Sequence, residues 1–155
     1  MTINFKNFME DHQVDCVVSP GNSYGLMDGG YDLAISEWFD WKQQDIVQRY
    51  ILDHFYGEQP VATSFIVDIE ATGIKLIHTP TMRKPGPIVD ENVVYQCMRT
   101  TLITAHKNKV ASIVIPAFGG QCGNVKPQVL CNLMYNAYLQ IKNPPEEISW
   151  DLCKH

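Results

Sequence analysis

Two apolar runs of strand length each end in a glycine-rich loop that leads into a helical pattern. The first is "VVSPGNSYGLMDGGYDLAI", residues 17–35, and the second is "ASIVIPAFGGQCGN", residues 111–124. Continuous apolar runs of this length are typical of strands that helices cover on both faces. Because such strands alternate with helices along the chain, the sequence predicts an α/β fold with a mostly parallel sheet between two helical layers.

The other elements follow from hydrophobic periodicity and turn residues. Helices are expected over 32–39, 45–56, 91–108 and 127–141, and strands over 14–19, 61–67, 75–79 and 111–115. Shorter elements are expected at the two ends: strands at 2–5 and 147–153, and a helix or turn at 6–12. A length of 155 residues with 45% apolar content predicts a single domain over 1–155.

The charge and the cysteines narrow the class of protein. A net charge of −5 argues against broad binding to nucleic acid or to an anionic membrane, although it permits a local anion site made of backbone amides. No apolar run approaches the ~20 residues of a membrane span, and no signal peptide is expected at the N-terminus. The five cysteines are scattered without CxxC pairs, which predicts reduced thiols, a cytoplasmic protein and no zinc site.

The two glycine loops follow strands, and α/β sheets bind their ligands at the carboxyl ends of strands. Glycines let a backbone approach a ligand closely, and helix N-termini add positive partial charge, so a phosphate or diphosphate is the natural ligand. The alternative is that each glycine pair only makes a tight strand-to-helix turn. Two such loops after two apolar strands weaken that alternative.

Several side chains near these loops have both a functional and a structural interpretation. Asn22 could hold a ribose hydroxyl or carbonyl, or could only shape the turn. Asp32 could bind a sugar hydroxyl or orient a water for attack, or could cap its helix. His78 is expected to be structural, whereas Arg83 and Lys84 could reach a phosphate or belong to a solvated loop.

The aromatic residues and the cysteine of the loops are equally open to two interpretations. Tyr24, Tyr31 and Phe118 could form the wall of a ribose site or fold back onto the core. Cys122 would be a nucleophile only with a base beside it, and because no such partner is evident it is taken as a small loop residue.

Four segments in order resemble the macro domain, the ADP-ribose-binding module. "VVSPGN…DGGYDLAI" is similar to the family's first loop, "IVNAAN…GGGVDGAI". "GEQPVATSFIVDI…IKLIHTP" and "ENVVYQCMRTTLITAHKN" resemble the strand pair and the helix that follow. "ASIVIPAFGGQCGN" resembles the diphosphate loop "SIafPaisTGvyG", so that the likeness spans about residues 14 to 141.

The resemblance implies a three-layer α/β/α fold with a central mixed sheet. It implies that the first loop holds the distal ribose and the second the diphosphate, and that Asn22 and Asp32 are the catalytic residues in hydrolytic members. The positions that it places against the ligand are Ser19, Pro20, Gly21, Asn22, Met27, Gly29, Gly30, Tyr31, Ala117, Phe118, Gly119, Gly120, Gln121, Cys122, Gly123 and Asn124. No cofactor and no metal are implied.

The sequence departs from the family pattern at four places. The family's early "GDIT" has no counterpart in "NFMEDHQVD", Ser19 replaces the first Asn of "NAAN", Gln121 replaces a glycine of the second loop, and Gly123 replaces its aromatic residue. Three functions therefore stay open: a hydrolase that removes ADP-ribose from a modified acceptor or acts on ADP-ribose 1″-phosphate, a non-catalytic reader of ADP-ribose or a related nucleotide, and a scaffold without a ligand. The expected partners are the nucleotide and an ADP-ribosylated protein.

Overall fold

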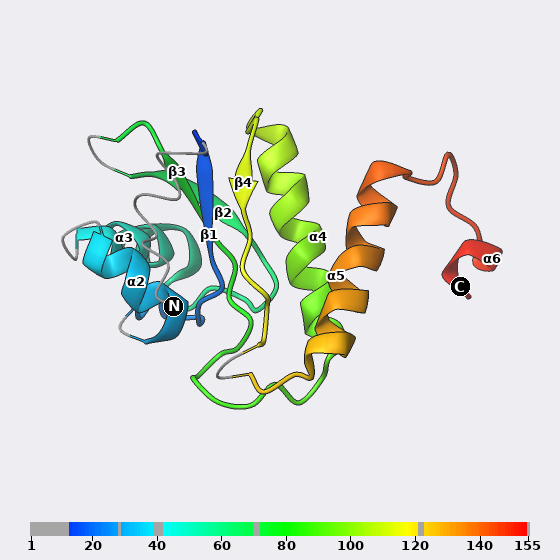
Figure 1. Cartoon of the computed structure of the whole chain (residues 1–155), viewed down its shortest axis with the longest axis horizontal. Coiled ribbons are helices and arrows are strands. Elements are labelled where there is room, and N and C mark those ends of the chain that lie inside the picture. The colour runs from blue at the N-terminus through cyan, green and yellow to red at the C-terminus, as the bar shows by residue number, and fades with distance from the viewer. Residues whose placement is uncertain (1–12, 28, 39–41, 70–71, 121–122, 155) are drawn as a thin grey trace.

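The computed structural model describes residues 13–27, 29–38, 42–69, 72–120 and 123–154 (Figure 1). Its elements are β1 (Cys16–Ser19), α2 (Gly30–Trp38), α3 (Lys42–Phe55), β2 (Phe65–Asp68), β3 (Lys75–His78), α4 (Asn92–Lys107), β4 (Ile113–Val114), α5 (Pro127–Lys142) and α6 (Trp150–Cys153). The short elements predicted at 2–5 and 6–12 lie outside the described residues.

The sheet has four strands in the order β2-β3-β1-β4. β1 pairs in parallel with β3 and with β4, while β2 pairs antiparallel with β3. Helices α2 and α3 lie on one side of the sheet, and α4 and α5 on the other (Figure 1). The predicted α/β fold with a mixed, mostly parallel sheet in three layers is confirmed.

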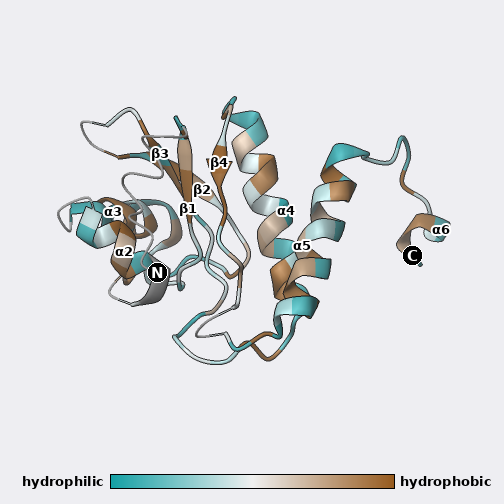
Figure 2. Ribbon diagram, in the orientation of Figure 1, coloured by the Kyte–Doolittle hydropathy of each residue, from teal (hydrophilic) through white to brown (hydrophobic). Residues whose placement is uncertain are grey.

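The central strands are buried on both faces, as their apolar runs predict. Val17 and Leu76 belong to the hydrophobic core on the α2 and α3 side, whereas Val18 and Ile77 belong to the core on the α4 side. Successive residues of a strand point to opposite faces, so a run of apolar residues fills both cores at once. β1 and β4 lie on the hydrophobic side of the colour scale in Figure 2.

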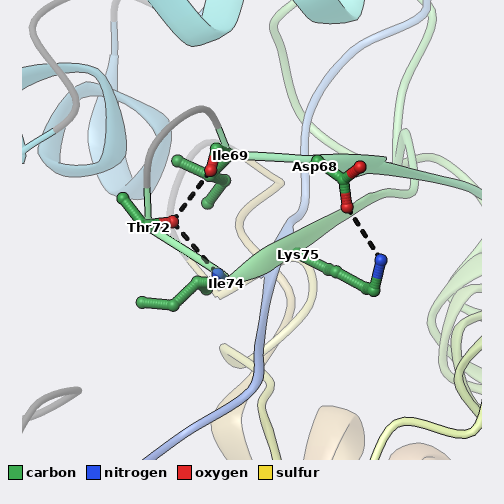
Figure 3. Close-up of polar contacts among 5 residues, drawn as sticks. All are labelled: Asp68, Ile69, Thr72, Ile74 and Lys75. Carbon is green, nitrogen blue, oxygen red and sulfur yellow. Dashed lines mark hydrogen bonds and ion pairs between the residues drawn. The ribbon is translucent and has the colours of Figure 1, made fainter.

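The antiparallel pair β2–β3 is closed by side-chain contacts at its turn (Figure 3). The Thr72 hydroxyl donates to the Ile69 carbonyl over 2.9 Å and accepts from the Ile74 amide over 3.0 Å. Asp68 and Lys75 stand opposite each other in the ladder and form an ion pair of 2.7 Å. These contacts support the register of β2 against β3, while the separate pairing of β3 with β1 places His78 beside Ser19.

Several predicted strands differ from the observed elements: the strand predicted over 111–115 is confined to Ile113–Val114, and the one predicted over 14–19 begins at Cys16. The segment 147–153 was predicted as a strand and that prediction is wrong, because 150–153 form helix α6, whose first turn is capped by the Ser149 hydroxyl accepting from the Leu152 amide. The strand predicted over 61–67 begins only at Phe65. The segment before Phe65 forms a turn instead of a strand. Ala62 has a φ of 62°, outside the range of a strand, and its amide donates to the Pro80 carbonyl.

Replacing Gly25 with alanine is expected to destabilise the fold by roughly 2–4 kcal/mol. Gly25 has φ +67°, and a Cβ there would lie 2.9 Å from both Val47 and Ile51 of α3. Gly73→Ala is the matched control, because Gly73 has φ +73° but open space around it, so that only the cost of about 1 kcal/mol for the backbone is expected. Urea denaturation measures both, and equal losses would contradict the predicted clash.

Candidate functional site

The loop between β1 and α2, residues 20–29 (loop 1), is organised by the side chain of Asn22. The Asn22 Oδ1 accepts from the amides of Tyr24 and Leu26 over 3.1 and 3.2 Å, and its Nδ2 donates to the Leu26 carbonyl over 3.0 Å. The residue is 7% exposed. Both ends of its amide are therefore used in shaping loop 1, which is the turn-making role that the sequence left open.

Loop 1 is held from behind by two other segments. The Ser23 amide donates to the Met82 carbonyl and the Thr81 amide to the Gly21 carbonyl, which joins loop 1 to the proline-rich segment 79–90 (the proline loop). The Gln59 amide donates to the Ser23 carbonyl over 2.8 Å. The first part of loop 1 is thus fastened to the body of the protein at Gly21 and Ser23.

Asp32 lies in the first turn of α2 with its carboxyl directed at the end of β1. Its Oδ1 accepts a hydrogen bond of 2.6 Å from the Ser19 hydroxyl, and the residue is 6% exposed. Burial raises the pKa of the Asp32 carboxyl from 3.8 to about 7, while the bond from Ser19 acts in the opposite direction. The helix begins at Gly30, so Asp32 is its third residue and not its N-cap residue, and the carboxylate contacts the end of β1.

His78 ends β3 directly beside Ser19 and is fully buried. Its Nδ1 lies 2.6 Å from Gln59 Oε1, and burial lowers the pKa of the imidazole to about 3, so the ring is neutral. A Cβ on Gly21 would lie 2.6 Å from His78 Nε2 and 3.1 Å from Asp32 Oδ2. Ser19, Gly21, Asp32 and His78 therefore form one buried polar cluster at the carboxyl ends of β1 and β3.

From its sequence context, His78 is expected to be a structural residue only. Two signals point toward the cluster: His78 is the last residue of an apolar strand, and that strand is adjacent and parallel to the one that leads into loop 1. The pairing of Ser19 with His78 depends on the register of β1 and β3, which the pattern of either strand alone does not specify.

The loop after β4, residues 117–124 (loop 2), leaves the same edge of the sheet as loop 1, because β4 is the parallel neighbour of β1. Two of its glycines are packed against Ile88 of the proline loop: a Cβ would lie 2.9 Å from Ile88 Cδ1 at Gly119 and 2.5 Å from it at Gly123. The Ile88 amide donates to the Gly123 carbonyl over 2.9 Å. The absence of a side chain at Gly119 and Gly123 thus lets the proline loop pack against loop 2. Gln121 and Cys122 lie outside the described residues.

The remaining predicted ligand positions fall into three groups. Gly29, Ala117, Gly120 and Asn124 are exposed, and a side chain at Gly29 would meet nothing within 4 Å. Met27 and Phe118 are fully buried, so their side chains belong to the core. Pro20 is half-buried. Gly30 and Tyr31 lie in the first turn of α2.

Arg83 joins the proline loop to the outer side of loop 1. Its guanidinium pairs with Glu58 and lies 5.7 Å from the centre of the Tyr24 ring. The Tyr24 ring thus lies at the rim of loop 1 beneath the Arg83 guanidinium. Lys84, which follows Arg83 in the chain, is exposed. Because Glu58 neutralises Arg83, the pair adds little net charge to the rim.

In the part of the chain that the structure describes, no three His, Cys, Asp or Glu side chains are grouped so that they could hold a metal ion. No described helix has the length and apolar character needed to cross a membrane. The thiols of Cys16 and Cys97 are buried, and burial raises the pKa of each to about 12, whereas Cys131 and Cys153 are exposed free cysteines.

A family model of the macro domain matches residues 18–134, and the chain belongs to this family. Solved structures share its fold at low identity. The Oceanobacillus iheyensis macrodomain with ADP is 21% identical, with a TM-score of 0.71 over 82% of this chain and 68% of that one. The macrodomain of Mycobacterium tuberculosis DarG is 17% identical, with a TM-score of 0.70 over 83% of each chain.

Two further relatives extend the comparison. Thermosipho africanus DarTG in complex with ADP-ribose is 14% identical, with a TM-score of 0.71 over 90% of this chain but only 40% of that longer one. An uncharacterised protein of Aquifex aeolicus (strain VF5) is 27% identical over 131 residues, which is 83% of this chain and 75% of the relative. The family and fold that the sequence motifs implied are thus confirmed.

Proposed function

We propose that this macro domain binds ADP-ribose, or a related nucleotide with a ribose on a diphosphate, between loop 1 and loop 2. The observation that carries the proposal is the position of the two loops at one edge of the parallel strands, with Gly29 and Gly120 exposed there. The positive end of α2 adjoins loop 1 and favours an anionic ligand. Solved structures of a macrodomain with ADP and of DarTG in complex with ADP-ribose support this class of ligand.

We further propose that the protein hydrolyses the bond between the distal ribose and a modified acceptor. The support is Asp32, a carboxyl with a pKa of about 7 in the first turn of α2. A buried acid that titrates near neutral pH is typical of a residue kept for chemistry, because burying it costs stability. The ionised carboxylate accepts a proton from water, the water oxygen bonds to the anomeric carbon, and the bond to the acceptor oxygen breaks. The proton then passes to the departing oxygen, which leaves Asp32 ionised again.

A second candidate function is a reader that binds the nucleotide without turnover. The observation that favours it is the use of the Asn22 amide in shaping loop 1: its Oδ1 accepts two bonds and its Nδ2 donates one of its two hydrogens to Leu26, which leaves a single N–H to hold a ligand. On this alternative Asp32 holds a ribose hydroxyl and does no chemistry.

Calorimetry with ADP-ribose, ADP and NAD tests the binding proposal, and we expect heat of binding with ADP-ribose in particular. Absence of heat and of any thermal shift with all three nucleotides would rule it out. Release of labelled ADP-ribose from an ADP-ribosylated protein, and of phosphate from ADP-ribose 1″-phosphate, then separates the two functions. Binding without either release establishes the reader.

A further inference from the structure

The cluster behind loop 1 contains a buried imidazole nitrogen whose hydrogen-bonding role the geometry fixes. Gln59 Nε2 lies within hydrogen-bond distance of the carbonyls of Thr63 and His78, at 3.0 and 3.3 Å, so the Gln59 Oε1 is the atom that faces the ring. A carbonyl oxygen only accepts, and His78 Nδ1 must therefore carry the proton. The other nitrogen, Nε2, is left as a pure acceptor.

This acceptor has no hydrogen-bond partner among the described residues, although the side chain is fully buried. An unpaired polar atom in a protein interior costs about 1–3 kcal/mol, and ordered water usually provides the missing bond. His78 Nε2 faces Gly21, and Asp32 Oδ2 faces the same glycine from α2. Both atoms are acceptors when Asp32 is ionised, so a donor with two protons satisfies both.

We propose that His78 Nε2 and Asp32 Oδ2 bind one internal water between them beside Gly21, and that His78 is thereby a positioning residue for the Asp32 carboxyl. Both atoms face the backbone of Gly21, and a Cβ there would fall 2.6 Å from Nε2 and 3.1 Å from Oδ2, so that any other residue would obstruct them. The Ser19 hydroxyl holds Oδ1 from β1, and the water holds Oδ2 from β3. The carboxyl is then fixed at both oxygens to two neighbouring strands.

Few interactions set the pKa of Asp32, so the effect of the water on that pKa is expected to be measurable. The pKa shifts of Asp32 and His78 arise from burial, with the Ser19 hydroxyl as the other contribution at Asp32. Among the described residues, no charged side chain of α2 or α3 is a named cause of either shift. A water that donates to the carboxylate favours its ionised form, so loss of the water is expected to raise the pKa of Asp32.

Two substitutions of His78 separate the water contact from the contact with Gln59. His78→Asn places an amide NH2 near Nδ1 and keeps the bond to Gln59 but removes the acceptor at Nε2, whereas His78→Gln places an amide oxygen near Nε2 and loses the bond to Gln59. We expect the pKa of Asp32 to rise by about one unit in His78→Asn and to stay near the wild-type value in His78→Gln. His106→Asn, at an exposed position of α4, is the control.

Carbon-13 NMR titration of Asp32 in the ligand-free protein measures these values, and a high-resolution crystal structure is expected to show a water about 2.8–3.0 Å from both atoms. A titration that changes in His78→Gln but not in His78→Asn would overturn the proposal, as would density without a water at Nε2. The link to catalysis rests on the proposed function, but both measurements use the free protein. A failure of ADP-ribose binding is therefore distinguishable from a failure of the water site.

Discussion

Asp32→Asn is expected to lower the release of ADP-ribose by about 100-fold or more while the protein becomes more stable at neutral pH. An amide still accepts the bond from Ser19, so the fold and loop 1 are preserved. It cannot take a proton from water, so the chemical step is lost. Single-turnover release of labelled ADP-ribose measures the first effect, and chemical denaturation at pH 7.5 measures the second.

The gain in stability follows from linkage between protonation and folding. The pKa of Asp32 is raised from 3.8 to about 7 in the folded state, so between those values the folded protein holds a proton that the unfolded chain has released. The free energy of unfolding therefore falls as the pH rises from about 4 to about 7 and is level above that. Asparagine removes this loss, which amounts to roughly 2–4 kcal/mol.

His78 has the opposite dependence, and the comparison must allow for it. Its pKa is lowered from 6.5 to about 3, so its contribution to stability is lost as the pH falls below 6.5. The wild-type curve is the sum of both effects, and only the difference between wild type and Asp32→Asn isolates the carboxyl. Glu37→Gln, an exposed acid on the same helix, is the control. A difference that does not vary between pH 4 and 7 would show that Asp32 is not held as described.

Gly29→Glu is expected to weaken ADP-ribose binding by about 100-fold or more without unfolding the protein. A side chain at Gly29 meets nothing within 4 Å, so the fold tolerates it, and on the proposed function it projects toward the bound nucleotide. The carboxylate adds bulk and repels a ligand that carries two phosphate charges. Calorimetry with ADP-ribose measures the affinity, and thermal unfolding monitors the fold.

Gly86→Glu is the matched control for this substitution. Gly86 also has open space around its Cβ position and lies in the proline loop, so the change in charge is the same. Retention of affinity in both variants would exclude the proposed place of the ligand, whereas an equal loss in both would indicate a general effect of charge. Gly29→Lys separates bulk from sign, because lysine keeps the bulk and reverses the charge.

The layers and most elements of the fold could be predicted because they depend on short-range patterns. The run through Val17 and Val18 predicted a strand buried on both faces, and Pro127 marked the first turn of α5. The ends of the chain were harder: Ser149 caps a short helix that its neighbours, Ile148 and Trp150, do not indicate, and both of these are exposed. Patterning predicts an element only where one face is buried.

The site could be predicted in outline but not in its contacts. The motifs predicted a site at loop 1, loop 2 and Asp32, and that placement stays a prediction. The structure shows that the side chains of Met27 and Phe118 are fully buried in the two hydrophobic cores, which the motifs did not indicate. Ile88 packs against Gly119 and Gly123 from 31 and 35 positions away, a contact that no local pattern encodes. The same holds for His78, whose neighbour Gly21 depends on strand register.

Gln59 connects three parts of this site, and the connection has a kinetic consequence. Its backbone amide holds Ser23 of loop 1, while its side chain holds Thr63 and both the ring and the carbonyl of His78. We therefore expect loop 1 to move with the sheet around Ser23, and not as a separate lid. A nucleotide arriving there meets a preformed surface, so its association rate is expected to depend on diffusion and orientation, with no slow step in which the loop must first become ordered.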